Sequence, residues 1–62
     1  HSQGINIGRD VWIGADVGIV DGVHIGDKAV IAMNSMVTKA VADYAIVAGN
    51  PARVIGDRRE KK

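Results

Sequence analysis

Branched aliphatic residues return at every sixth position along most of the chain. They open six successive units, at Ile7, Ile13, Ile19, Ile25, Ile31 and Val37. An α-helix repeats its apolar face every three or four residues and a half-buried strand every two, so a period of six fits neither. The period predicts a solenoid of very short β-strands joined by tight turns, with these six side chains pointing inward.

Two further columns of residues keep the same phase. Residues that are mostly small follow the aliphatic positions, at Gly8, Gly14, Val20, Gly26, Ala32 and Thr38, and a second series of mostly apolar residues runs through Val11, Val17, Val23, Ala29, Ser35 and Val41. Residues that favour turns stand between the columns, at Arg9-Asp10, Ala15-Asp16, Asp21-Gly22, Asp27-Lys28 and Asn34-Ser35. We therefore predict about two coils of solenoid over residues 1–42.

The period ends after Val41, and a C-terminal extension is predicted over residues 43–62. Gly49-Asn50-Pro51 is a strong turn signal between two apolar pairs, Ile46-Val47 and Val54-Ile55. We expect these pairs to be short extended pieces that pack on the last coil and close its strand edges. The remainder is a basic tail, for which a short helix over Asp57 to Lys62 is an alternative.

Composition narrows the function classes. The net charge of +1 comes from the last six residues, and the aromatic residues are only Trp12 and Tyr44, too few for stacking on bases. A solvated terminus is the ordinary state of such a tail, so no nucleic acid partner is expected. The chain has no cysteine, which favours a reducing compartment and hence the cytoplasm. No apolar run approaches the length of a membrane span, so no membrane partner is expected.

The chain is short for its predicted architecture. A chain of this size buries only about 60% of its unfolded surface on folding, and solenoids need roughly three or more stacked repeats. The first residue is His1 rather than Met. We therefore expect the C-terminal portion of a longer protein, one that is not stable as an isolated monomer.

Four motifs together resemble the C-terminal portion of the hexapeptide-repeat acetyltransferases. They are the stretches Ile7 to Ala15, Gly22 to Asp27, Val37-Thr38-Lys39 and Ala48 to Ile55. Their order is most similar to that in galactoside, maltose and capsular-sugar O-acetyltransferases. The resemblance implies an all-β fold, a left-handed parallel β-helix, and assembly into homotrimers. It also implies acetyl-CoA bound between subunits and acetyl transfer to a sugar or glycan hydroxyl.

The same resemblance assigns five cofactor-binding positions. Ala15 and Met33 fall where coenzyme A meets the turns through backbone groups, although relatives often have Ser and Ala there. Thr38, Lys39 and Arg53 fall where a hydroxyl and two cations meet the phosphates of the cofactor. The alternative is that all five only fill turns or the solvated surface. Relatives often carry a further basic residue at the position of Gly56, a role that Arg58 or Arg59 could fill here.

No catalytic base is assigned within the chain. In the resembled family a histidine upstream of the final coils takes the proton of the acceptor. His24 is expected on the surface and His1 stands at the chain end, so the base is expected upstream and the chain alone is expected to be inactive. Trp12 is expected beside the cofactor groove or between subunits, with simple surface exposure as the alternative.

Two other functions remain open for this sequence. One is a non-catalytic solenoid that serves as a structural or trimerisation module. The other is a metal enzyme on the same fold, similar to the carbonic anhydrases that use left-handed β-helices. That second function is disfavoured because zinc there needs three histidine ligands and this chain has two histidines. No metal site is therefore predicted.

Overall fold

The computed structural model describes residues 4–60, which form eight β-strands and no helix. Six strands of two residues occupy the repeat: β1 (Asn6–Ile7), β2 (Trp12–Ile13), β3 (Gly18–Ile19), β4 (His24–Ile25), β5 (Val30–Ile31) and β6 (Met36–Val37). Two longer strands follow, β7 (Ala45–Ala48) and β8 (Arg53–Asp57). Each short strand ends on one of the six periodic aliphatic residues. The all-β prediction is confirmed, with one strand per six-residue unit.

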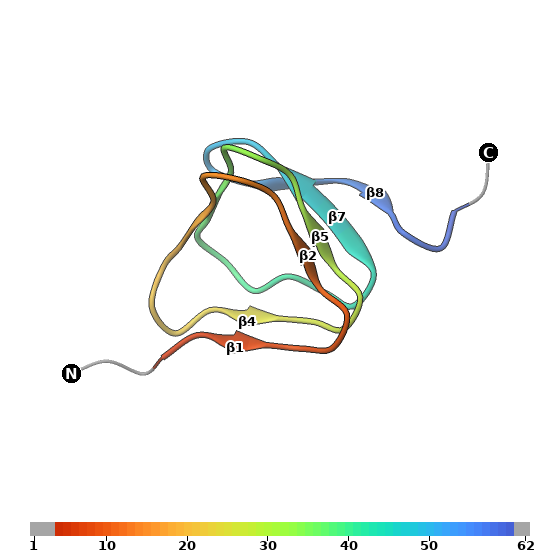
Figure 1. Ribbon diagram of the computed structural model, residues 1–62, viewed down its shortest axis with the longest axis horizontal. Coiled ribbons are helices and arrows are strands. Elements are labelled where there is room, and N and C mark those ends of the chain that lie inside the picture. Colours follow the sequence, from red (N-terminus) through yellow and green to blue (C-terminus); the bar gives the residue numbers. More distant parts are fainter. Residues whose placement is uncertain (1–3, 61–62) are drawn as a thin grey trace.

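The short strands stack in parallel and form the three walls of a triangular coil (Figure 1). Wall 1 pairs β1 with β4, wall 2 pairs β2 with β5, and wall 3 pairs β3 with β6. In every pair the partner lies three units further along the chain, as Asn6 lies opposite His24. Three strands therefore complete one turn of the coil, and the first two coils follow directly from the period.

A third, partial coil begins earlier than the period predicts. Val41 bridges to Ile25 on wall 1, where a strict period would place Asp43. The prediction that put Val41 in the second column is therefore wrong. The corner at residues 38–40 is shortened and holds none of the left-handed residues that the other corners use. On wall 2, β7 continues the sheet and pairs in parallel with β5.

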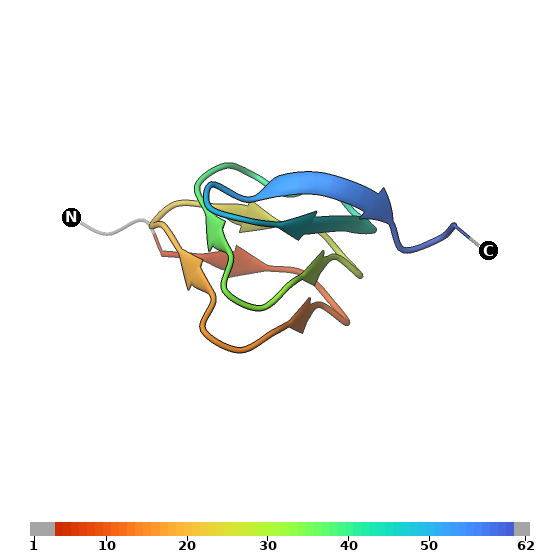
Figure 2. The ribbon, with the colours of Figure 1, turned by 90° about the horizontal axis from the view of Figure 1, so that it is seen from above.

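The chain then reverses at residues 49–52, and β8 runs antiparallel to β7 (Figure 2). Wall 2 thus becomes a four-stranded sheet in the order β2-β5-β7-β8. The extended pieces predicted around Ile46 and Val54 are confirmed as these last two strands. Beyond Asp57 the described tail forms a turn rather than the helix considered above. Lys61 and Lys62 lie outside the described residues.

The core lies in the second coil. Ile25, Ile31 and Val37 are almost fully buried and stack with residues of the second column, which include Val23, Ala29 and Ser35. Ile19 is only partly buried, and Ile7 and Ile13 are exposed. Within the described residues no coil covers the outer side of the first one. The inward prediction is thus confirmed for the second coil, while the first coil forms an open end.

Most corners are turned by a residue with left-handed backbone. Positive φ values of 53° at Asp10, 58° at Asp16, 62° at Lys28 and 61° at Asn34 repeat in phase with the coil, and Gly22 has a φ of 84°. Short polar residues and glycine tolerate this region best. The turn near residue 34 spans Met33 and Asn34, not Asn34 and Ser35 as predicted. Ser35 is buried instead, where its hydroxyl donates to the Ala32 carbonyl at 2.7 Å and accepts from the Gly49 N–H at 3.2 Å.

Candidate functional site

An open apolar groove runs along wall 2 and into the turns that follow it. Its volume is about 490 Å³, and it is lined by the same four positions of the first two coils, residues 12–15 and 30–33. Ala15 and Met33, two of the predicted contact residues, both line this groove and both are exposed. The structure therefore brings together two positions that the sequence separates by a whole coil.

Gly14 allows the two coils to approach each other closely at this groove. A Cβ atom at Gly14 would lie 2.7 Å from the backbone nitrogen of Met33 and 3.2 Å from the carbonyl carbon of Ala32. The Gly14 N–H donates to the Ile31 carbonyl at 2.8 Å. Any larger residue would push the Met33 turn away from the first coil, so the shape of the groove depends on the small residue that follows Ile13.

The groove offers backbone donors. The Ala15 carbonyl accepts from the N–H of Asn34 at 2.9 Å and is therefore already engaged. The N–H groups of Ala15 and Met33 make no hydrogen bond within residues 4–60. These two groups can donate to the carbonyls of an extended ligand that lies in the groove. The side chain of Met33, 65% exposed, contributes an apolar, adaptable wall.

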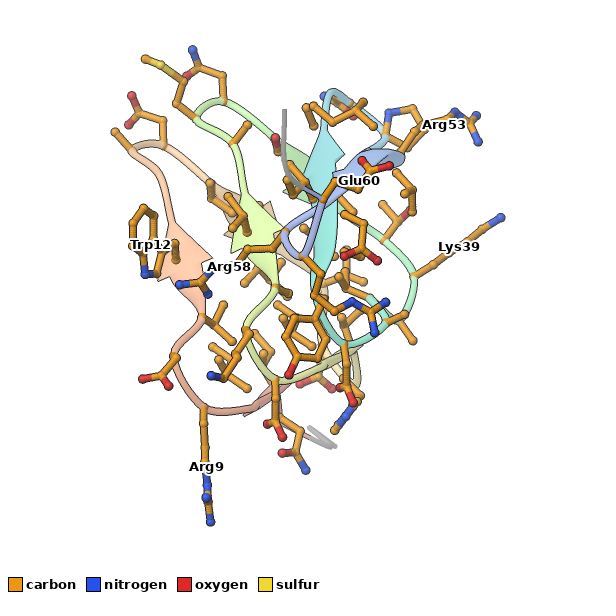
Figure 3. The ribbon with its side chains drawn as sticks, turned by 90° about the vertical axis from the view of Figure 1, so that its right-hand side faces the viewer. Arg9, Trp12, Lys39, Arg53, Arg58 and Glu60 are labelled. Carbon is orange, nitrogen blue, oxygen red and sulfur yellow. The ribbon has the colours of Figure 1, made fainter. Side chains whose placement is uncertain are left out.

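The predicted phosphate-binding residues lie elsewhere. Thr38 and Lys39 follow β6, and Arg53 begins β8; all three are exposed and none lines the groove. Lys39 and Arg53 extend into solvent on the side opposite Trp12 (Figure 3). Neither side chain forms an ion pair within the described part of the chain. The five predicted positions therefore fall into two groups, one in the groove and one near the C-terminal edge of the coil.

The two alternative cations are engaged by the chain itself. The Arg58 guanidinium donates to the carbonyl oxygens of Asp10 at 2.7 Å and of Lys28 at 3.1 Å. Arg59 forms an ion pair with Asp57 at 2.7 Å and lies over the Tyr44 ring. Hydrogen bonds from the Arg59 side chain and backbone lower the pKa of Asp57 to about 2. In this structure Arg58 and Arg59 therefore serve internal contacts.

Trp12 lines the groove together with Ala15 and Met33, which agrees with one of the positions considered for it, and its exposure agrees with the surface alternative. Trp12 is 64% exposed, and the guanidinium of Arg58 lies over its ring, with 4.8 Å between the Arg58 Cζ and the ring centroid. The sequence contains no signal for this contact, because the two residues stand at opposite ends of the chain and share no motif.

Neither a base nor a metal site is found beside the groove. His24 lies on β4 of wall 1 and is exposed, as expected, and His1 lies outside the described residues. Among residues 4–60 no three His, Cys, Asp or Glu side chains gather closely enough to hold a metal ion. The same range contains no helix of the length and hydrophobicity needed to cross a membrane.

Sequence comparison finds relatives of this chain among acetyltransferases. The family model described as the hexapeptide repeat of succinyl-transferase matches residues 4–39. A "probable macrolide acetyltransferase" from Lysinibacillus sphaericus is 58% identical over 52 residues, which cover 84% of this chain and 29% of the relative. The galactoside O-acetyltransferase of Escherichia coli K12 is 44% identical over 61 residues, which cover 98% of this chain and 30% of that protein.

Structural comparison agrees with the sequence matches. The crystal structure of a hexapeptide-repeat containing acetyltransferase from Vibrio cholerae O1 biovar eltor, complexed with acetyl coenzyme A, superposes with a TM-score of 0.87 at 43% sequence identity. The match covers 90% of this chain and 31% of that one. The chain thus spans less than a third of the length of these three proteins.

Proposed function

This chain belongs to the hexapeptide-repeat family of transferases, and we propose that it is the C-terminal portion of an acetyl-CoA-dependent O-acetyltransferase. The acceptor is a sugar or glycan hydroxyl. The observation that carries the proposal is the apolar groove of wall 2. Ala15 and Met33, the two positions that the family resemblance assigns to the coenzyme, line it together.

The groove suits the long, flexible arm of coenzyme A. Its apolar lining can pack along the arm, while the N–H groups of Ala15 and Met33 donate to amide carbonyls. A wall of stacked strands holds these donors at fixed spacing, which lowers the entropic cost of aligning the reactants. Acetyl-CoA, when bound, supplies the activated acetyl group. The acceptor hydroxyl would attack the thioester carbonyl directly, without an acyl-enzyme, so that a C–O bond forms and the C–S bond breaks. The proton of the hydroxyl would pass to a base outside this chain and from there to the sulfur, and coenzyme A would leave as the free thiol.

Thr38, Lys39 and Arg53 are proposed to hold the phosphates of the coenzyme. The chain carries a net charge of only +1, so a multiply charged anion needs local cations to bind. A guanidinium offers paired donors to phosphate oxygens, and an ammonium acts as a point charge. Lys39 and Arg53 are solvent-exposed and make no ion pair within residues 4–60, which leaves both available.

The winding sense and the assembly are part of the same proposal. We propose a left-handed coil, supported by the superposition on a member of the resembled family. We also propose a homotrimer in which a neighbouring subunit completes the groove. Val54 and Ile55 are large apolar side chains left exposed on β8, as is typical of surfaces that a partner covers. The cytoplasm is the proposed location, supported by the absence of cysteine.

A second candidate acceptor is an antibiotic hydroxyl. The relative named for macrolides has greater identity to this chain than the galactoside enzyme has. The chemistry at the coenzyme is the same for both acceptors, and this chain holds no residue assigned to acceptor binding. Initial rates with a panel of sugars, glycans and macrolides, at saturating acetyl-CoA, distinguish the two. The non-catalytic module and the carbonic-anhydrase-like enzyme are not favoured.

The test of the coenzyme site uses Lys39→Ala and Arg53→Ala in the complete protein that contains this chain. Charge-assisted hydrogen bonds contribute about 1.5–3 kcal/mol each, so each variant should raise the KM for acetyl-CoA roughly tenfold or more. The KM for the acceptor should change much less. Arg9→Ala is the matched control, because Arg9 also extends into solvent (Figure 3) but lies outside the assigned site.

Parental affinity for acetyl-CoA in both variants would show that the family assignment fails at these positions. The non-catalytic module would then be the better account of the chain. If Arg9→Ala raised the KM for acetyl-CoA by the same factor, the effect would instead be a general effect of removing a positive charge.

A further inference from the structure

Arg58 connects the C-terminal segment to each of the three coils by hydrogen bonds, and Figure 3 shows its side chain beside Trp12. Its Nη1 atom donates to the carbonyl oxygen of Asp10 in the first coil at 2.7 Å and to that of Lys28 in the second at 3.1 Å. Its backbone N–H donates to the carbonyl of Tyr44 in the third at 2.7 Å. Asp10, Lys28 and Tyr44 are the left-handed residues of one stacked corner, with φ values of 53°, 62° and 66°. One arginine thus ties together one corner of the solenoid.

In the described part of the chain, the carbonyls of Asp10 and Lys28 accept no hydrogen bond from the backbone N–H groups that join the stacked coils. At this corner the N–H of Lys28 donates to the carbonyl of Arg9, and the N–H of Tyr44 donates to that of Asp27. Within residues 4–60, the next carbonyl in each turn, that of Asp10 or of Lys28, accepts from no backbone N–H of the coil above it. A guanidinium, with several N–H donors in a rigid fork, can serve two such carbonyls at once. Here the single Nη1 atom serves both carbonyls, which leaves the rest of the planar guanidinium to lie against an aromatic ring.

The same guanidinium lies against the groove. Its Cζ atom is 4.8 Å from the centroid of the Trp12 ring, within the range of a cation–π contact. Trp12 belongs to a strand of only two residues and is mostly exposed, so little else in the described chain restricts its rotamer. The backbone carbonyls fix the guanidinium, and the guanidinium in turn fixes the indole that lines the groove.

We propose that Arg58 is a positioning residue of the coenzyme groove, which holds the Trp12 indole in place as part of the groove wall. The affinity for coenzyme A then depends on a side chain of the C-terminal segment that does not line the groove. The identity of the ligand rests on the proposed function. The coupling between Arg58 and Trp12 does not, and it can be measured without any ligand.

The experiment compares Arg58→Gln, Arg58→Lys and the control Arg9→Gln in the complete protein. Two quantities are measured. The first is the acrylamide quenching of the fluorescence of Trp12, which is identified as the emission that is lost in Trp12→Phe. The second is the dissociation constant of coenzyme A, measured by calorimetry. Arg58→Gln should increase the quenching and weaken the binding of coenzyme A about three- to tenfold. This is the range for loss of a cation–π contact together with the hydrogen bonds that orient it. Arg58→Lys should recover only part of this loss. In both Arg58 variants the KM for acetyl-CoA should rise while kcat stays at the parental value.

A double-mutant cycle with Trp12→Ala separates positioning from general stability. If Arg58 acts through the indole, adding Arg58→Gln to Trp12→Ala should weaken the binding of coenzyme A no further than Trp12→Ala does alone. The same loss with and without Trp12 would overturn the proposal, as would unchanged quenching in Arg58→Gln. If the parent fails to bind coenzyme A, the proposed function fails, and increased quenching in Arg58→Gln would still identify the Arg58–Trp12 contact. The melting temperature of each variant verifies that it is folded.

Discussion

The first and second coils carry the same repeat but differ in how deeply they are buried. Ile7 and Ile25 are direct partners on wall 1, yet their exposed fractions are 46% and 0%. On wall 2 the corresponding values for Ile13 and Ile31 are 44% and 1%. The second coil is covered on both sides, by the first coil and by the partial third one. Residues with identical signals in the sequence therefore differ in what they contribute to stability.

The candidate groove spans this difference. One half of its lining, residues 12–15, belongs to the open first coil, and the other half, residues 30–33, belongs to the covered second coil. The first-coil half gains its additional support from the C-terminal segment through Arg58. Packing thus holds one side of the groove, whereas a long-range polar contact helps to hold the other.

The comparison is tested most strongly by truncating paired residues. Ile31→Ala removes a fully buried side chain and should lower the free energy of unfolding by about 2–5 kcal/mol. Ile13→Ala removes a side chain that is already nearly half exposed and should cost roughly half as much or less. The measurement is urea unfolding of the 62-residue chain, in which no further coil covers Ile13, at a concentration where association between copies keeps the parent folded. Equal costs would mean that another surface covers the first coil.

A second prediction concerns Ser35, a polar residue in the core of the covered second coil. Ser35→Ala removes a buried hydroxyl and its two hydrogen bonds, to the Ala32 carbonyl and from the Gly49 N–H, and should cost about 0.5–1.5 kcal/mol for each bond. Thr38→Ala is the matched control, because that hydroxyl is exposed and makes no hydrogen bond within the described residues. The control should stay within about 0.5 kcal/mol of the parent. Urea unfolding of both variants checks this, and a similar cost for both would contradict the role given to Ser35.

The smallest expected effect concerns pH at the end of wall 2. The hydrogen bonds from Arg59 depress the pKa of Asp57 to about 2, below the usual value of about 3.9. Because the folded pKa is lowered, the pair should stabilise the fold fully above about pH 4 and lose this effect as the pH falls toward 2. The pair is exposed, so the effect should be small and reduced by salt.

The melting temperatures of the parent and of Asp57→Asn, measured from pH 5 to pH 2, should therefore converge as the pH falls. A difference that stays constant over this range would show that the ion pair does not contribute.

Much of the local structure could be predicted from the sequence. The period of six placed each short strand, and Asp10, Asp16, Gly22 and Lys28 take up the predicted turns. The prediction failed for Val41, where a corner lost two residues, and at Ser35, where a buried hydroxyl takes the place of an aliphatic side chain. Val41 stands where the chain starts its partial third coil, and Ser35, in the second coil, bonds to Gly49 of that third coil. The local pattern of residues contains no information about the contacts that a residue makes with the next coil.

The sequence alone determined the repeat, because β-branched side chains and left-handed turn residues act over only a few neighbours. The resemblance to a family also placed Ala15 and Met33 among the candidate contacts. Only the tertiary structure decided that Ile31 is buried while Ile13 is exposed, that the two candidate contact residues share one groove, and that Arg58 lies over the Trp12 ring. Each of these depends on which coils stack and on how a distant segment returns across them, and such long-range contacts leave no period in the sequence.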